Sequence, residues 1–288
     1  ADSYRRVRNT ARFLLANLNG FNVEESVAEQ EMVALDRWIV ARAKALQDEL
    51  FEAYEKYDLL VVTQKIIHFC SIELGSFYLD VIKDRQYTAK SDGIARRSCQ
   101  TAMYHIIEAL VRWIGPITSF TAQEIWEALP GERSEFVFTE TWYEGFNGFT
   151  QSDTFNDGLW HSVISVKDAA NQAMEKARKE GQLGGSLEAS ISLYATESLY
   201  NALSSFDNEL RFVLITSGVS LTLVDSKPAD AQETDVDGLW LSVSKAKGEK
   251  CVRCWHHLED VGTHAGHEEL CGRCVTNIDG EGEVRQYA

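Results

Sequence analysis

This sequence of 288 residues has no long apolar run, few prolines and no excess of basic charge. No stretch of about 18 consecutive apolar residues occurs, so the sequence predicts no transmembrane helix and no membrane partner. Only three prolines occur, and 44% of the residues are hydrophobic, which is ordinary for a globular protein. The 28 Lys and Arg residues face 44 Asp and Glu residues, a formal net charge of −16. Such an acidic chain is not expected to bind DNA or other nucleic acid non-specifically.

An export signal is also missing. The first residues, Ala-Asp-Ser-Tyr-Arg-Arg, contain neither an initiator Met nor an apolar signal region. They have the character of a helix interior, so we expect the sequence to continue a longer chain. Cys70 and Cys99 lie on apolar helical faces and are expected to be buried free thiols. Together these features predict a cytoplasmic protein.

Four of the six cysteines lie close to the C-terminal end in a spacing that suits a metal. Cys251, Cys254, Cys271 and Cys274 form the pattern C-x2-C-x16-C-x2-C. Each pair can aim two sulfurs at one point through a tight turn, and two such turns supply a tetrahedron. Zn²⁺ accepts four thiolates in this geometry, so we predict one structural zinc ion with no open position for a water.

Other interpretations of the cysteines remain open. Two disulfides would require an oxidising compartment. An iron site of rubredoxin type shares the C-x2-C pairs, and sequence alone does not separate iron from zinc. A redox C-x-x-C is expected near a βαβ pattern and has no need of a duplicate. A nearby histidine could also replace one cysteine, and the candidates are His256, His257, His264 and His267.

Apolar residues at helical spacing predict five amphipathic helices in the first half of the chain. Ser26-Val-Ala-Glu29 has the form of a capping box that would open the second helix. The predicted helices cover about 3–18, 26–57, 58–83, 91–114 and 116–130, and short connections between them favour a helical bundle.

After about residue 135 the composition changes to glycine, aromatic and acidic residues. A helix is expected at about 158–180. Alternating apolar residues predict strands at 187–194, 219–223 and 239–243, with a helical stretch between the first two. The predicted fold is mainly α: a helical bundle, then a small α+β unit, then a four-Cys zinc ribbon. The expected parts are residues 1–135, 136–246 and 247–288.

Several motifs in the bundle resemble a known family. Leu35-Asp-Arg-Trp-Ile39, Ala53–Asp58 and the stretch Phe77–Tyr87 resemble the anticodon-binding helical domain of class I aminoacyl-tRNA synthetases for Ile, Val, Leu and Met. The stretch Gly115–Trp126 is similar to the next signature of that domain. The opening residues 4–19 together with the four-Cys ribbon resemble the bacterial isoleucyl-tRNA synthetases. The resemblance covers essentially the whole chain and implies a monomer that recognises the anticodon stem-loop of tRNA(Ile).

The catalytic signatures of these synthetases are not matched. His264-Ala-Gly-His267 reproduces the His-x-Gly-His signature by letter, but it lies between the two cysteine pairs and not after a strand that opens a helix. Nothing resembles the Lys-Met-Ser-Lys-Ser loop, and no βαβ alternation is present. We therefore expect this sequence to have no aminoacylation or editing activity of its own. ATP would be used only by a catalytic domain outside this sequence.

Basic residues are bunched despite the acidic composition, and the resemblance implies that some of them contact RNA. RNA loops are read through bases that splay out and stack on aromatic or arginine planes. The candidates are Arg5, Arg6, Arg8, Arg12, Lys83, Arg85, Arg96 and Arg97 in the bundle, and Arg253, Trp255 and Arg273 in the ribbon. The alternatives are a solvated helical face for the cations and simple packing for Trp255. A further alternative is that the ribbon docks a protein and the chain binds no RNA.

Overall fold

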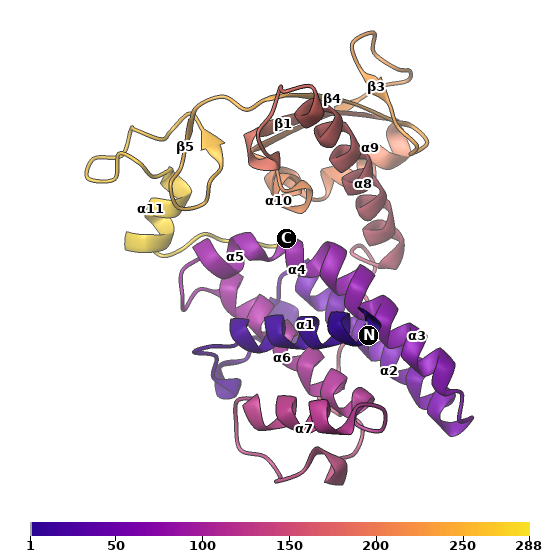
Figure 1. Ribbon diagram of the computed structural model, residues 1–288. Coiled ribbons are helices and arrows are strands. Elements are labelled where there is room, and N and C mark those ends of the chain that lie inside the picture. The colour runs from indigo at the N-terminus through magenta and orange to yellow at the C-terminus, as the bar shows by residue number, and fades with distance from the viewer. Residues whose placement is uncertain (1) are drawn as a thin grey trace. The chain divides into compact units, whose positions relative to one another are not determined.

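The computed structural model describes residues 2–288 and divides into two compact units. The helical unit comprises the chain up to Gln86 together with Ser91–Ser152, and the second unit comprises Tyr87–Lys90 and Asp153–Ala288. Figure 1 shows both, and each is described by itself below. The division places residues 136–152 with the helices. The boundaries of the three parts expected from the sequence stay predictions.

The helical unit confirms the expected bundle. Its long helices present apolar residues at intervals of three and four, so that each buries one face. In α2, for example, Leu35, Ile39, Leu46 and Leu50 are all fully buried. The helices are α1 Asp2–Asn17, α2 Ala34–Glu55, α3 Leu59–His68, α4 Leu79–Val81, α5 Lys83–Thr88, α6 Ile94–Ile114 and α7 Ser119–Ala128. Short 3-10 turns lie at Val23–Glu25, Glu29–Glu31 and Val137–Thr139.

The third predicted helix is interrupted by a wider turn. Between α3 and α4 the backbone forms a π-helix over Phe69–Tyr78. Here the Ser76 hydroxyl donates to the main-chain oxygen of Ser71, five residues earlier, at 3.0 Å. A Cβ at Gly75 would lie 3.0 Å from the main-chain oxygen of Cys70, so a side chain at Gly75 would crowd the backbone of this turn. Periodicity predicts the helix, but it does not predict this local change of winding.

The helical run Leu59–Thr88 has the length and apolar content needed to cross a membrane, judged by those two criteria alone. The core helix of a soluble protein meets the same criteria. Val62, Ile66, Phe69 and Leu74 of this run are buried within the helical unit. The expectation of no membrane partner stays a prediction.

An ion pair lies inside the helical unit and joins two of the motifs that carry the family resemblance. The Arg85 guanidinium donates to both carboxylate oxygens of Asp36, at 2.7 and 2.8 Å, and to the main-chain oxygen of Ala95 at 2.9 Å. The hydroxyls of Tyr78 and Ser98 also donate to Asp36, at 2.8 and 2.5 Å. Burial alone would lower the pKa of Arg85, but the Asp36 carboxylate raises it above its ordinary value. The buried Asp36 carboxylate therefore accepts hydrogen bonds from three side chains.

The second unit is built on a four-stranded sheet with the order β2-β1-β4-β3. Its first strand, β1, pairs in parallel with β2 and antiparallel with β4. One face of β1 consists of the buried residues Ala189, Ile191, Leu193 and Ala195, and helices α8 and α9 pack on the sheet. The elements are α8 Asp157–Lys179, β1 Ala189–Ala195, α9 Glu197–Ser204, α10 Leu210–Leu214, β2 Gly218–Leu223, β3 Gln232–Glu233 and β4 Leu239–Lys245, with 3-10 turns at Ser186–Glu188 and Asp207–Glu209.

The same unit ends in a small cysteine-rich element, coloured yellow in Figure 1. A short hairpin pairs β5 Glu249–Lys250 with β6 His257–Leu258, and helix α11 covers Gly272–Asp279. Together with the bundle and the sheet, this element confirms the mainly helical fold with an α+β part and a four-Cys end.

Candidate functional site

The four cysteines of the C-terminal end meet at one point. Cys251, Cys254, Cys271 and Cys274 are all buried, and their sulfur atoms lie within 4.8 Å of one another. The Sγ atoms of Cys254 and Cys271 are 3.7 Å apart. Sulfurs at about 2.3 Å from a tetrahedral zinc ion would lie about 3.8 Å from one another. The arrangement therefore fits a tetrahedrally bound ion.

Each cysteine pair is held by its own backbone hydrogen bonds. In the first pair, the N–H of Trp255 donates to the main-chain oxygen of Cys251, and the N–H of Cys251 donates to that of His256, both at 2.9 Å. Trp255 has a φ of 66°, which folds the chain back after Cys254. In the second pair, Cys271 precedes the first turn of α11, and its N–H donates to the sulfur of Cys251 at 3.4 Å. This bond from the main chain of the second turn to a sulfur of the first joins the two turns.

The electrostatics of the cluster favour a bound cation. Hydrogen bonds from the thiols of Cys271 and Cys274 lower the pKa of Cys254 far below its ordinary value. The same contact with Cys254 raises the pKa of Cys271 to about 12 and also raises that of Cys274. The neighbouring thiols thus favour a thiolate at Cys254, whereas four adjacent thiolates require a dication to offset their charge. Leu258, Val261 and Leu270 pack around the sulfurs and limit access of water.

The histidines considered as substitute ligands lie outside this cluster. Within residues 2–288, the four cysteines are the only His, Cys, Asp or Glu group whose ligand atoms are close enough to share an ion. His264 contacts Asp260 at 3.3 Å and His267 contacts Asp279 at 2.6 Å. Cys70 and Cys99 are buried free thiols, as expected. Burial raises the pKa of each of these two thiols to about 12.

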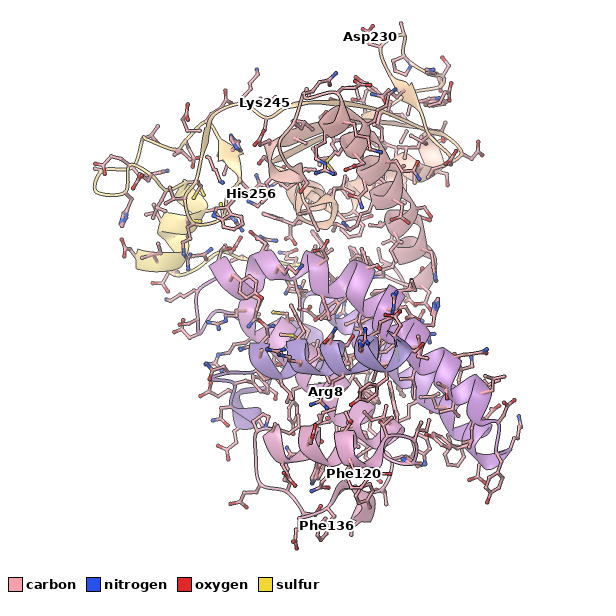
Figure 2. The ribbon with its side chains drawn as sticks, in the orientation of Figure 1. Arg8, Phe120, Phe136, Asp230, Lys245 and His256 are labelled. Atoms are coloured by element: carbon pink, nitrogen blue, oxygen red, sulfur yellow. The ribbon has the colours of Figure 1, made fainter. Side chains whose placement is uncertain are left out.

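Helix α1 exposes the four arginines predicted for RNA contact, and they differ in their partners. Arg6 pairs with Asp2 at 3.0 Å. Arg8, which is labelled in Figure 2, pairs with Glu124 at 2.7 Å. Arg5 and Arg12 are exposed, and no other side chain among the described residues pairs with them. They are seven residues apart, so they lie on the same side of the helix. Of the four, these two guanidinium groups are available to a phosphate without breaking an ion pair.

The second basic cluster is less accessible than expected, and one of its members is internal. Arg85 is 1% exposed and is bound to Asp36, so the prediction that it contacts RNA is wrong. Lys83 is exposed and pairs with Asp80 at 2.9 Å. Arg97 pairs with Glu25, and Arg96 is partly buried.

Of the three residues predicted to contact RNA from the cysteine-rich end, Trp255 is the exposed one. Trp255 is 60% exposed, and the Lys250 ammonium lies 5.2 Å from its ring centroid. Arg253 donates to the main-chain oxygen of Thr88 at 2.6 Å. Arg273 has a side chain that is only 11% exposed, and it lies between Glu283 and the ring of Phe212. Arg273 therefore serves the fold and is not presented as an open cation.

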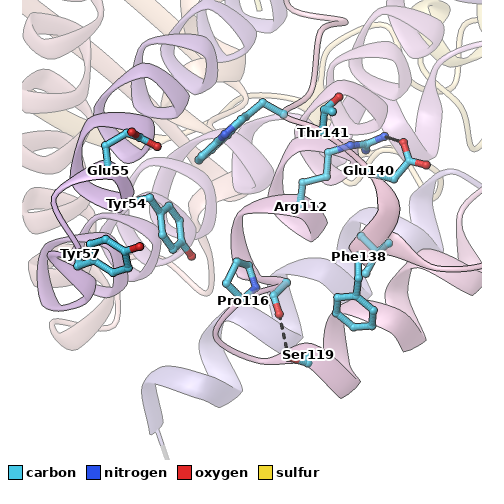
Figure 3. A pocket seen from close by; sticks show the side chains of 12 residues that line it. Tyr54, Glu55, Tyr57, Arg112, Pro116, Ser119, Phe138, Glu140 and Thr141 are labelled. Atoms are coloured by element: carbon cyan, nitrogen blue, oxygen red, sulfur yellow. Dashed lines mark hydrogen bonds and ion pairs between the residues drawn. The ribbon is translucent and has the colours of Figure 1, made fainter.

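The helical unit contains a cavity that no sequence motif predicts. A space of about 470 Å³ lies among residues of α2, α7 and the segment 137–142 (Figure 3). Tyr57 and Phe138 flank it and are largely exposed. Arg112, which also lines it, is already paired with Glu108 at 2.6 Å and Glu140 at 3.2 Å. With its cation neutralised and Glu55 at its rim, the cavity is not suited to a phosphate.

Comparison with known proteins identifies the family. Residues 36–193, more than half of the chain, match the family model described as the anticodon-binding domain of tRNA ligase. The chain belongs to this family of tRNA ligase anticodon-binding domains. The matched region of this anticodon-binding domain runs from Asp36 in α2 to Leu193 in β1, so it includes the buried Asp36–Arg85 pair.

The second match concerns the metal centre. Residues 248–277 match the zinc finger found in FPG and IleRS, and this range contains all four cysteines. With the geometry above, the site holds one structural zinc ion. When bound, zinc supplies a closed, four-thiolate crosslink between the two cysteine turns. Cys251, Cys254, Cys271 and Cys274 are the residues that hold it.

Curated relatives agree along the whole chain. The chain is 62% identical to an isoleucine--tRNA ligase of Pseudoalteromonas atlantica, 60% to one of Aeromonas hydrophila and 60% to one of Shewanella sediminis. Each alignment covers 100% of this chain but only 31%, 30% and 31% of the respective relative. The anticodon-binding domain and zinc finger described here thus span about a third of the length of the relatives they match.

Proposed function

We propose that this chain recognises the anticodon stem-loop of tRNA(Ile) as part of an isoleucine--tRNA ligase. The observation that carries the proposal is the joint match to an anticodon-binding domain and to a zinc finger found in IleRS, on a chain 62% identical to an isoleucine--tRNA ligase. The ATP-dependent ligase reaction is assigned to parts of the relatives that this chain does not cover. We infer that the chain alone has no ligase activity.

The proposed contacts divide into phosphate and base recognition. Exposed guanidinium groups of Arg5 and Arg12 on α1 are suited to RNA phosphates, with Lys83 as a further exposed cation. Trp255 offers an exposed ring on a turn whose conformation is fixed by the adjacent Cys254. An unpaired base that stacks on such a ring contributes about 1–3 kcal/mol. The ring would therefore hold an unpaired base of the loop, whose edge is then open to hydrogen bonds that read it, and the cations would supply the phosphate contacts.

Zinc contributes to this function through shape. The element from Lys247 onward is too small to hold a hydrophobic core without a crosslink, and its buried cluster consists mainly of the four cysteines. Its metal stays four-coordinate with protein ligands, so it has no catalytic role. We further propose that the protein is a cytoplasmic monomer that binds neither DNA nor membranes.

A binding experiment with two stem-loops tests the proposal. A fluorescent 17-nucleotide stem-loop that carries an Ile anticodon is titrated with the zinc-loaded protein, beside one in which only the anticodon is changed. Loss of the hydrogen bonds to the edge of one base, at about 1–3 kcal/mol, predicts roughly tenfold to hundredfold weaker binding of the altered loop. Equal affinity for the two loops would contradict anticodon recognition.

Salt dependence separates this function from the protein-docking alternative. Phosphate contacts by two or three cations predict that the logarithm of the binding constant falls against the logarithm of the salt concentration with a slope of about −1.4 to −2.1 for a single-stranded loop. A stem-loop that binds with no salt dependence would contradict the role given to α1. The variant Arg5→Gln/Arg12→Gln should reduce the slope, and Glu31→Gln in the same unit serves as a control for a simple change of charge.

A further inference from the structure

The last six residues of the chain are bound to the second unit by a carboxylate far from the cysteines in sequence. Glu209 accepts three consecutive main-chain N–H groups: that of Gln286 at 2.9 Å and those of Tyr287 and Ala288 at 2.8 Å. Three such charge-assisted bonds to one carboxylate define the path of the backbone. We call residues 283–288 the terminal segment.

Aromatic contacts hold the same segment against the core of the unit. The Tyr287 ring stacks on Phe155 with centroids 5.2 Å apart and an interplanar angle of 20°. The Arg285 guanidinium lies 3.2 Å from the ring centroid of Phe212, three residues after Glu209 in the chain, and Arg285 is only 6% exposed. The terminal segment is therefore a docked part of the fold.

The other end of the terminal segment is fastened to the helix that carries a zinc ligand. The Glu283 carboxylate accepts from Asn277 at 2.9 Å, from Arg285 at 2.8 Å and from Arg273 at 3.3 Å. The N–H of Glu283 donates to the Asn277 side chain at 2.8 Å. Arg273 and Asn277 are one turn apart on α11, and Cys274 lies between them in the chain. Glu283 therefore holds the side of α11 that carries these two residues.

These contacts form a continuous path from Glu209 to the metal centre. Glu209 holds residues 286–288, Glu283 of the same segment holds α11, and α11 carries Cys274. A second anchor lies near the first cysteine pair, where the N–H of His257 donates to the Ser217 hydroxyl at 2.8 Å. Nothing else is required for the position of Cys274 to depend on the docked terminal segment.

We propose that Glu209 is a positioning residue for the zinc centre, acting through the terminal segment and α11. The zinc ion and the docked segment stabilise each other: the ion holds Cys274 and so α11, while Glu209 holds the segment to which α11 is fastened. Loss of the zinc ion therefore loosens the terminal segment, and undocking of the terminal segment weakens the hold on the zinc ion. The inference does not depend on RNA binding, because it concerns zinc retention and the exposure of the terminal segment.

The test compares Glu209→Gln with Glu281→Gln. Glu281 is exposed, lies between α11 and the terminal segment, and has no side-chain partner within the described part of the chain. Zinc release is followed with a chromogenic chelator, and trypsin cleavage after Arg285 is followed by mass spectrometry. Outer-shell partners of metal ligands alter affinity by about tenfold or more, so Glu209→Gln should release zinc about tenfold faster and be cut sooner after Arg285. Release and cleavage equal to those of Glu281→Gln would overturn the proposal.

Two further measurements separate positioning from general damage. Glu283→Gln should also accelerate zinc release, and the double variant Glu209→Gln/Glu283→Gln should be little faster than either single one, because both interrupt one path. Fully additive effects would contradict a shared path. If Glu209→Gln does not fold, the unaltered protein is stripped of zinc: cleavage after Arg285 should accelerate while cleavage within α1–α7 stays unchanged. Unchanged cleavage after Arg285 would overturn the proposal.

Discussion

Replacing Arg85 by methionine should destabilise the helical unit strongly, although no RNA contact is removed. Asp36 is fully buried, and it would lose two hydrogen bonds of 2.7 and 2.8 Å and its only counter-charge in the network. Only the hydroxyls of Tyr78 and Ser98 would remain on the carboxylate. Removing one partner of a buried ion pair costs about 3–5 kcal/mol. For a unit of this size that is a fall in Tm of about 10 °C.

Urea unfolding followed by far-UV circular dichroism measures this cost, with Lys83→Ala as the control. Lys83 is an exposed member of the same basic cluster, and its surface pair with Asp80 predicts a loss of at most about 1 kcal/mol. The double variant Asp36→Leu/Arg85→Met should recover much of the lost stability, because a buried pair can be replaced by apolar residues at little cost. A loss below about 1 kcal/mol for Arg85→Met, or additive effects in the double variant, would refute the reasoning.

Three other predictions concern the ring, the ligands and pH. Trp255→Ala should weaken binding of the Ile stem-loop by about 1–3 kcal/mol with an unchanged zinc content, and Trp255→Phe should retain most of the affinity. Titration with the labelled stem-loop measures both affinities. Loss of zinc from Trp255→Ala would contradict a role in stacking alone. Cys274→Ser should lower zinc below one equivalent and expose the C-terminal end to protease while α1–α7 stay folded, as elemental analysis and limited proteolysis will show; full zinc content would contradict four-thiolate ligation. Burial lowers the pKa of His105 from 6.5 to about 4. The unfolded chain binds this proton more tightly than the folded chain does. Neutral His105 therefore contributes fully to the free energy of unfolding above about pH 6.5, and this contribution of about 3 kcal/mol is lost as pH falls to about 4. Urea unfolding at several pH values should show that His105→Gln loses less free energy of unfolding between about pH 6.5 and 4 than the unaltered protein does. An equal loss in both proteins would contradict the role given to His105.

The overall architecture was predictable because it follows from periodic patterns. Apolar residues at helical spacing in α2 and α6 bury as expected, and the alternation in β1 places one face in the core. The metal ligands were predictable for a similar reason, since their spacing in sequence directly determines how two turns can converge. Local patterns fail where the outcome depends on a distant partner. The capping box proposed at Ser26–Glu29 does not open α2, which begins at Ala34, and the Ser26 hydroxyl donates instead to the Val23 main chain.

Charged residues show this limit most clearly. Arg85 is predicted to contact RNA because it lies in a run of basic residues, yet it also lies three and four residues after the buried Ile82 and Val81. That spacing was a usable signal of burial, although nothing local identified Asp36 as its partner. Arg273 is predicted to contact RNA as one of the planar groups that the ribbon could hold against the loop. Its actual partners, Phe212 and Glu283, are distant or outside the cysteine pattern, so spacing could not reveal them.

The most direct test of the central claim is the affinity ratio of the zinc-loaded protein for two stem-loops that differ only in the anticodon, measured in one buffer with the zinc content of the same sample. The account predicts one zinc per chain and at least roughly tenfold tighter binding of the loop with the Ile anticodon. Equal binding of both loops by a fully zinc-loaded protein would contradict it.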